Sequence, residues 1–141
     1  MKFLFYLIIS FSIHLYSYAI LPTQFYFRHY NIEDGVSSNN ISSIIQDEKG
    51  YIWIGTDNGL NRFDGIRFIH FKKGDPHYPS FQANNISTIY EMNSEELWIG
   101  TEHGVYIYNQ RSDKFSFFNI ETSNKVSIKS WVSDIIQDKK K

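Results

Sequence analysis

Apolar and polar residues alternate in short segments along most of the chain, and residues typical of tight turns separate these segments. Alternation with a period of two is typical of β-strands with one buried face, and hardly any window shows the 3.6-residue period of an amphipathic helix. The first set of segments predicts strands at 41–46, 51–55, 60–63 and 66–71. A second set predicts strands at 86–91, 96–100, 105–108 and 114–119.

The two sets of predicted strands repeat one pattern at a fixed spacing. Trp53-Ile54-Gly55-Thr56 is repeated by Trp98-Ile99-Gly100-Thr101, and Gly59 is repeated by Gly104, so equivalent positions lie 45 residues apart. A repeat of about this length, made of short strands and glycine turns, is typical of a β-propeller blade. Residues 132–138 begin a third copy of the pattern, and the sequence ends at Lys141.

The sequence therefore predicts an all-β fold, a partial β-propeller of two four-stranded antiparallel blades with a stray strand at each end. The stray strands are expected at 25–30 and 132–138, and the first is expected to pair with a final blade and close a ring. Two blades cannot close a ring, so we expect this chain to be the N-terminal part of a longer protein. The expected divisions are a signal peptide at 1–19, a lead-in at 20–40, blades at 41–83 and 84–122, and a truncated third blade at 123–141.

The first nineteen residues have the pattern of a secretory signal. Lys2 precedes a mostly apolar run at 3–15, and Ser17-Tyr18-Ala19 is a small-x-small site for cleavage after Ala19. An uncleaved membrane anchor is the alternative, but it needs about 20 apolar residues and this run is shorter. We therefore expect an exported, periplasmic chain in which a signal-peptide helix precedes the propeller.

Charge and cysteine content narrow the class of protein further. The formal net charge is −1 with acidic and basic residues well mixed, so no basic face indicates a nucleic-acid partner. The 141 residues include no cysteine. An exported domain of this sequence therefore depends on packing and strand pairing rather than on disulfides.

Residues that recur in both blades are interpreted as parts of the fold. A tryptophan in mid-strand can fill the wedge between blades, a glycine allows close backbone approach or a bulge, and a threonine can hydrogen-bond the next turn. Stacking of the tryptophans on a sugar is the functional alternative. The residues of this structural repeat are Trp53, Gly55, Thr56, Gly59, Trp98, Gly100, Thr101 and Gly104.

The sequence contains no recognisable catalytic or cofactor motif. No serine lies in a Gly-x-Ser-x-Gly sequence, the histidines lack metal-ligand spacing, and no glycine-rich phosphate loop is present. We therefore expect no catalysis, no metal and no cofactor in this chain.

Loops at one end of the predicted blades are the candidate ligand site. In an up-and-down blade, the turn between the second and third strands emerges at the same end as the connector to the next blade. Binding residues favour loops held by a rigid scaffold. The candidates at this end are Asp57, Asn58, His77, Tyr78, Glu102 and His103.

Three stretches of the first repeat resemble the two-component regulator propeller repeat. They are residues 34–41, residues 45–56 (which include Trp53-Ile54-Gly55-Thr56) and residues 59–65. The second repeat departs from the family pattern at 93–96 and at Glu102-His103. The family builds the periplasmic sensor of hybrid two-component systems that are common in Bacteroidetes.

This resemblance implies a longer parent protein with two propellers, a small β-sandwich, a membrane helix, a histidine kinase, receiver domains and a DNA-binding domain. Family members respond to oligosaccharides through a phosphorelay. The implied partners are the remaining blades and an oligosaccharide, within a homodimeric parent anchored in the inner membrane. None of the kinase's phosphoacceptor, ATP-binding or receiver residues is present. We therefore expect this chain to be a non-enzymatic, ligand-sensing fragment in signal transduction.

Two other interpretations stay open from the sequence alone. Propellers also host lyases and hydrolases, so the chain could be part of an exported propeller enzyme whose catalytic residues lie elsewhere. The chain could also be an inactive, truncated gene product. A complete reading frame would separate these interpretations, because it would show either kinase motifs after a membrane helix or clustered catalytic carboxylates or histidines.

Overall fold

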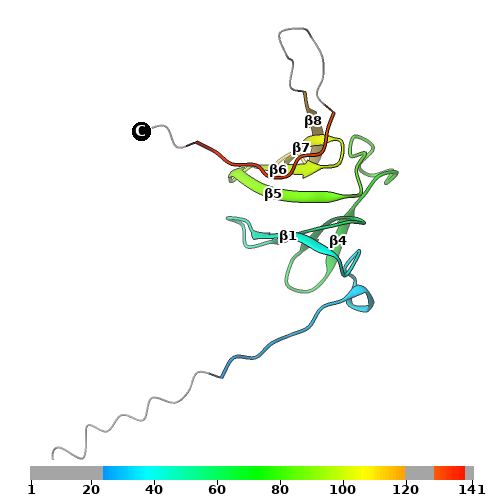
Figure 1. The fold of residues 1–141 in the computed structure, drawn as a ribbon. Coiled ribbons are helices and arrows are strands. Elements are labelled where there is room, and N and C mark those ends of the chain that lie inside the picture. The colour runs from blue at the N-terminus through cyan, green and yellow to red at the C-terminus, as the bar shows by residue number, and fades with distance from the viewer. Residues whose placement is uncertain (1–23, 120–128, 139–141) are drawn as a thin grey trace, which may run out of the picture.

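The computed structural model describes residues 24–119 and 129–138, which form two four-stranded antiparallel sheets (Figure 1). The first sheet consists of β1 (Ile41–Gln46), β2 (Ile52–Thr56), β3 (Gly59–Phe63) and β4 (Phe68–Phe71). The second consists of β5 (Ile86–Asn93), β6 (Glu96–Thr101), β7 (Gly104–Asn109) and β8 (Lys114–Phe118). In each sheet the strands lie in chain order, as in a propeller blade, so the predicted all-β fold is confirmed. The signal-peptide prediction at 1–19 lies outside the described residues.

All eight predicted strands form, and their ends differ from the prediction where a side chain holds a turn. β4 begins at Phe68 rather than at 66, because the Asp64 carboxylate accepts the backbone N–H groups of Ile66 and Arg67 at 2.9 and 2.8 Å. These hydrogen bonds keep both residues in the turn rather than in the sheet. β5 extends to Asn93, so the second blade has a tighter first hairpin than the first blade.

The two flanking segments differ from the prediction of a strand at each end. Residues 25–30 and 132–138 lie outside any strand in the described part of the chain. A strand needs a neighbouring backbone to pair with, and the described residues 24–30 make no backbone hydrogen bond. Phe27 is 95 % exposed, which is unusual for an aromatic side chain.

Residues 132–138 nevertheless contact the second sheet, and this contact is equivalent to the one between the first and second sheets. Ser42 Oγ of β1 donates to the carbonyl of Ile86 in β5 at 2.5 Å, and Ser87 Oγ of β5 donates in the same way to the carbonyl of Val132. Val132 N–H also donates to the Thr101 carbonyl at 3.1 Å. The third copy of the repeat therefore starts on the free face of the second sheet.

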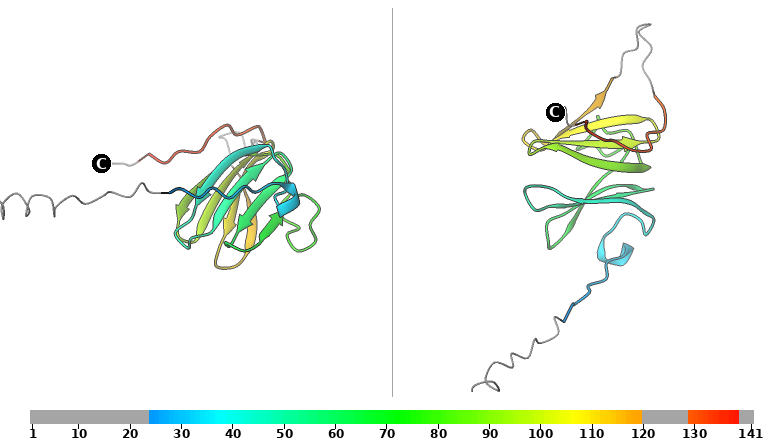
Figure 2. Two further views of the ribbon diagram at one scale, coloured as in Figure 1. Left: turned by 90° about the horizontal axis from the view of Figure 1, so that it is seen from below. Right: turned by 60° about the vertical axis from the view of Figure 1, so that its left-hand side comes forward.

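The hydrophobic core lies between the two sheets, which face each other in Figure 2. Trp53 is fully buried there, with its ring 5.7 Å from Phe71 of its own sheet and 5.2 Å from Tyr108 of the other. Packed aromatic pairs add to the free energy gained from burial. The other buried members of this core are Leu60, Phe81, Ala83, Ile86, Ile89, Leu97, Ile99, Tyr106 and Phe115.

Equivalent residues in the two sheets are buried to different degrees. Ile89 of β5 is 4 % exposed, whereas Ile44, its counterpart in β1, is 60 % exposed. Trp53 is fully buried, whereas Trp98, its counterpart in β6, is only partly buried. Each sheet therefore presents two apolar faces, and one face of each is only partly covered by the described residues.

Candidate functional site

The turn between β2 and β3 is held by the last residue of β2. Thr56 Oγ1 donates to the Gly59 carbonyl at 2.8 Å and accepts the Asn58 N–H at 3.0 Å. Gly59 has φ +116°, a conformation that residues with a Cβ rarely adopt. The threonine and the glycine thus fix the shape of this turn and the direction in which Asp57 and Asn58 project.

The turn between β6 and β7 repeats this geometry. Thr101 Oγ1 donates to the Gly104 carbonyl at 2.9 Å and accepts the His103 N–H at 3.1 Å. Gly104 has φ +122°. The two turns therefore lie at equivalent ends of neighbouring sheets and present two adjacent pairs of polar residues.

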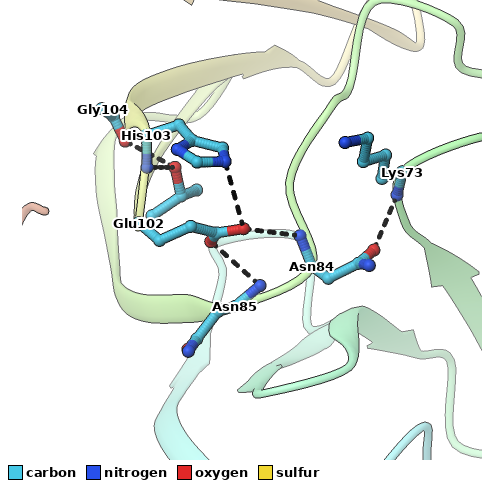
Figure 3. Close-up of polar contacts among 7 residues, drawn as sticks. Lys73, Asn84, Asn85, Glu102, His103 and Gly104 are labelled. Carbon is cyan, nitrogen blue, oxygen red and sulfur yellow. Dashed lines mark hydrogen bonds and ion pairs between the residues drawn. The ribbon is translucent and has the colours of Figure 1, made fainter. Parts of the chain in front are cut away.

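Glu102 ties the second turn to the connector between the sheets (Figure 3). Its carboxylate accepts the backbone N–H groups of Asn84 and Asn85 at 3.4 and 3.0 Å and lies 3.9 Å from His103 Nε2. The Asn84 side chain in turn accepts the Lys73 N–H at 3.0 Å. The charge of Glu102 is thus engaged by backbone donors, which leaves it less available to a ligand.

The first turn is tied to the same connector and to the lead-in. Gly59 N–H donates to the Asn84 carbonyl at 2.6 Å, and Asn58 Nδ2 donates to the Ser37 carbonyl at 2.9 Å. Asn40 Nδ2 donates to the Asp57 carboxylate at 2.7 Å, and this hydrogen bond lowers the pKa of Asp57. Asn84 therefore connects both turns into one polar surface.

The structure brings four of the six predicted ligand residues together and separates the other two. Asp57, Asn58, Glu102 and His103 lie at one end of the two sheets, as expected from the repeat. His77 and Tyr78, which were expected at this end, instead line a pocket of about 420 Å³ beside the β7–β8 turn, together with Asp113. That turn is at the opposite end of the second sheet.

Aromatic packing explains the position of Tyr78. Its ring lies 4.8 Å from Phe71 and 5.6 Å from Phe115, and its hydroxyl donates to Asp113 Oδ2 at 3.0 Å. Burial raises the pKa of Tyr78, and the Asp113 hydrogen bond adds to this effect. The connector therefore runs along the outer strands rather than staying at the end where it leaves β4.

The end of the sheets that carries the β2–β3 and β6–β7 turns also has a pocket of about 520 Å³, which was not predicted from the sequence. We call it the connector pocket, and it is lined by Lys73, Gln82, His103, Tyr106, Phe117 and Lys129. Only His103 was a sequence candidate. One feature of the sequence could have indicated this pocket. The repeat changes residue type there, since Tyr106 takes the position that Asn61 has in the first blade.

Two further observations on the described residues concern metal-binding groups and membrane-spanning helices. Within 24–119 and 129–138, His, Asp and Glu residues form no group of three suited to a metal ion. The same residues include no helix long and apolar enough to cross a membrane.

Comparisons with known proteins identify similar sequences and structures. Residues 35–58 match the family model described as two component regulator propeller. The histidine kinase P4 of Formosa agariphila is 36 % identical over an alignment of 63 residues, and the match covers 41 % of this chain and 5 % of that protein.

Two solved structures from B. thetaiotaomicron are similar to this chain over most of its length. The extracellular domain of the putative hybrid two component system BT3049 is 31 % identical, with a TM-score of 0.61 over 72 % of this chain and 14 % of that one. The corresponding domain of BT4673 is 32 % identical, with a TM-score of 0.56 over 66 % of this chain and 13 % of that one. This chain thus spans only a small part of each relative.

Proposed function

We propose that this chain, which matches the two component regulator propeller family at residues 35–58, supplies adjacent blades to the extracellular sensor region of a hybrid two-component system. The observation that carries this proposal is the likeness to the extracellular domain of BT3049, at 31 % identity over 72 % of this chain. The uneven burial of equivalent residues supports it, because Ile44 and Trp98 would be covered by further blades.

The lead-in contributes to closure of the ring in this proposal. A pocket of about 550 Å³ lies on the open face of the first sheet and is lined in part by Tyr30, Ile44 and Ile54. The neighbouring aromatic residues at 25–27 are exposed in the described structure. Residues 25–30 would pair with the last blade of the ring, whose sheet would fill this pocket.

The role proposed for these blades is detection of an extracellular oligosaccharide, and the chain itself performs no catalysis. The support is the polar surface at the β2–β3 and β6–β7 turns, where Asp57, Asn58 and His103 project from a fixed scaffold. The partners that this proposal gives the region are the kinase, the inner-membrane anchor and a second copy of the parent protein. The region would then lie in the periplasm, and a phosphorelay would carry the signal onward.

Calorimetric titration of the complete protein with a panel of oligosaccharides tests the proposal. We expect one class of saccharide to bind and to stimulate phosphorylation of the kinase. The Asn58→Ala variant should weaken binding, whereas a control variant at the other end, Glu48→Ala, should leave it unchanged. A ligand-bound structure that contacts only the end carrying the β1–β2 turns would contradict the proposed site, and no binding of any saccharide would contradict the sensing role.

A further inference from the structure

The connector pocket has an aromatic wall formed by two paired strands. Tyr106 of β7 and Phe117 of β8 lie opposite each other in the sheet, with ring centroids 5.1 Å apart and planes at 75°. Tyr106 is 5 % exposed and its ring also packs against Phe81. Burial raises the pKa of the Tyr106 phenol, and a hydrogen bond with the Gln82 backbone partly offsets this effect. The wall is therefore rigid and apolar.

Two lysines stand at the rim of this wall. The Lys73 backbone is fixed by hydrogen bonds to the Ala83 carbonyl and to the Asn84 side chain, and its side chain reaches toward the side on which the His103 ring lies (Figure 3). Lys129 Nζ lies 5.8 Å from the centre of the Phe117 ring. In the described part of the chain, neither ammonium group forms an ion pair with a carboxylate. The residues that line the pocket thus supply two ammonium groups and no carboxylate. The Glu102 carboxylate, 3.9 Å from His103 Nε2, is held by the N–H groups of Asn84 and Asn85.

The first blade shows that the fold does not require an open pocket at this position. Asn61 and His70 are paired there in the same way as Tyr106 and Phe117 in the second blade. The lead-in closes the space, because Ser37 N–H donates to Asn61 Oδ1 at 2.9 Å and His70 Nε2 lies 2.5 Å from the Gly35 carbonyl. In the second blade Tyr106 and Phe117 take these two positions, and the backbone of Gln82, which corresponds to Ser37, meets the Tyr106 hydroxyl instead of an amide.

We propose that the connector pocket binds a sugar ring that carries a carboxylate or a sulfate group. This inference rests on the proposed function and narrows the ligand to acidic saccharides. The apolar face of the ring would lie against Phe117, and the acidic group would lie between Lys73 and Lys129. Charge-assisted hydrogen bonds from ammonium groups are about twice as strong as neutral ones. A volume of about 520 Å³ is within the range of small-ligand sites.

Paired probes that differ only in charge test this inference on the complete protein. The first pair is an oligogalacturonate and its methyl ester, and the second is a sulfated galactan oligosaccharide and its desulfated form. Calorimetry should show at least about tenfold tighter binding of one acidic member than of its neutral partner. Lys73→Gln and Lys129→Gln should each weaken that binding about tenfold, with affinity falling as salt rises. Lys49→Gln, in the exposed β1–β2 turn, is the matched control and should bind as the wild type does.

The outcomes separate this inference from the proposed function. Equal affinity for charged and neutral members, or full affinity in both pocket variants, would overturn the acidic-ligand inference while leaving saccharide sensing in place. Failure of both pairs and of the wider saccharide panel would overturn both. Thermal unfolding of each variant should match the wild type, because the substituted lysines are exposed.

Discussion

Gly55 lies so close to Ile86 of the next sheet that a Cβ on Gly55 would come within 2.8 Å of Ile86 Cγ2. The contact recurs one repeat later, where a Cβ on Gly100 would lie 3.0 Å from Val132 Cγ1. Real side chains essentially never show a contact as short as 2.8 Å. The glycine of the Trp-Ile-Gly-Thr sequence therefore sets how closely one blade can approach the next.

Replacing Gly55 with alanine should destabilise the propeller by about 1–3 kcal/mol, because the added methyl group overpacks the contact between the sheets. Urea unfolding of the complete propeller measures this change. Ile86→Ala removes the Cγ2 atom that the new methyl group would meet. In that background the cost of Gly55→Ala should be smaller by about 1 kcal/mol, and a strictly additive double mutant would contradict the contact.

Asp47→Ala should cost about 1–3 kcal/mol, because it removes the acceptor of two N–H groups. The Asp47 carboxylate accepts Trp53 Nε1 at 2.7 Å and the Tyr51 N–H at 2.9 Å. The neighbouring variant Glu48→Ala, at an exposed turn position, should stay within about 0.5 kcal/mol of the wild type. Equal effects of the two substitutions in urea unfolding would show that the buried hydrogen bonds contribute nothing.

Stability should decrease as the pH rises above about 10, and Tyr108→Phe should reduce this decrease. Burial is the main cause that raises the pKa of Tyr108 above the ordinary tyrosine value of 10.0, and the hydrogen bond that Tyr108 donates to Asp113 adds to it. The folded state therefore favours the protonated phenol, so this contribution is complete below pH 10 and is lost above it. Unfolding followed at pH 8 and at pH 11 measures the difference. Tyr26→Phe, at a position that is 89 % exposed, is the control and should leave the profile unchanged.

Residues 24–138 expressed alone should self-associate. The exposed face of Ile44 and the partly covered Trp98 leave apolar surface on both outer faces of the sheet pair. Sedimentation at several protein concentrations should show a molecular mass that increases with concentration. A monomer that unfolds cooperatively at all concentrations would mean that two sheets are sufficient for a stable domain.

The strands and their pairing were predictable because the signals are local. Alternation within Lys114–Phe118 and the Asn58-Gly59 turn each depend on a few neighbouring residues, and the 45-residue spacing shows the same local signals in both blades. The start of β4 was missed because the Asp64 side chain, rather than hydrophobic alternation, decides which residues join the sheet.

The positions of the candidate site residues were predictable only where the repeat itself fixes a turn. The repeat placed Glu102 and His103 correctly beside the connector, since equivalent turns lie at equivalent ends of neighbouring sheets. The path of the connector depends on where the Tyr78 ring finds aromatic partners, and sequence spacing does not report this. Lys73 and Lys129 are far apart in the sequence and meet at one pocket because Lys73 follows β4 and Lys129 follows β8, and both lie beside the second sheet.

A structure of the complete protein tests the central claim most directly, namely that these sheets are neighbouring blades of a larger ring. We expect Trp98 to be buried by the sheet that begins at Val132, and Ile44 to be buried by a blade that includes residues 25–30 as a strand. Ile44 and Trp98 left exposed to solvent, or covered by a helical domain, would contradict the account.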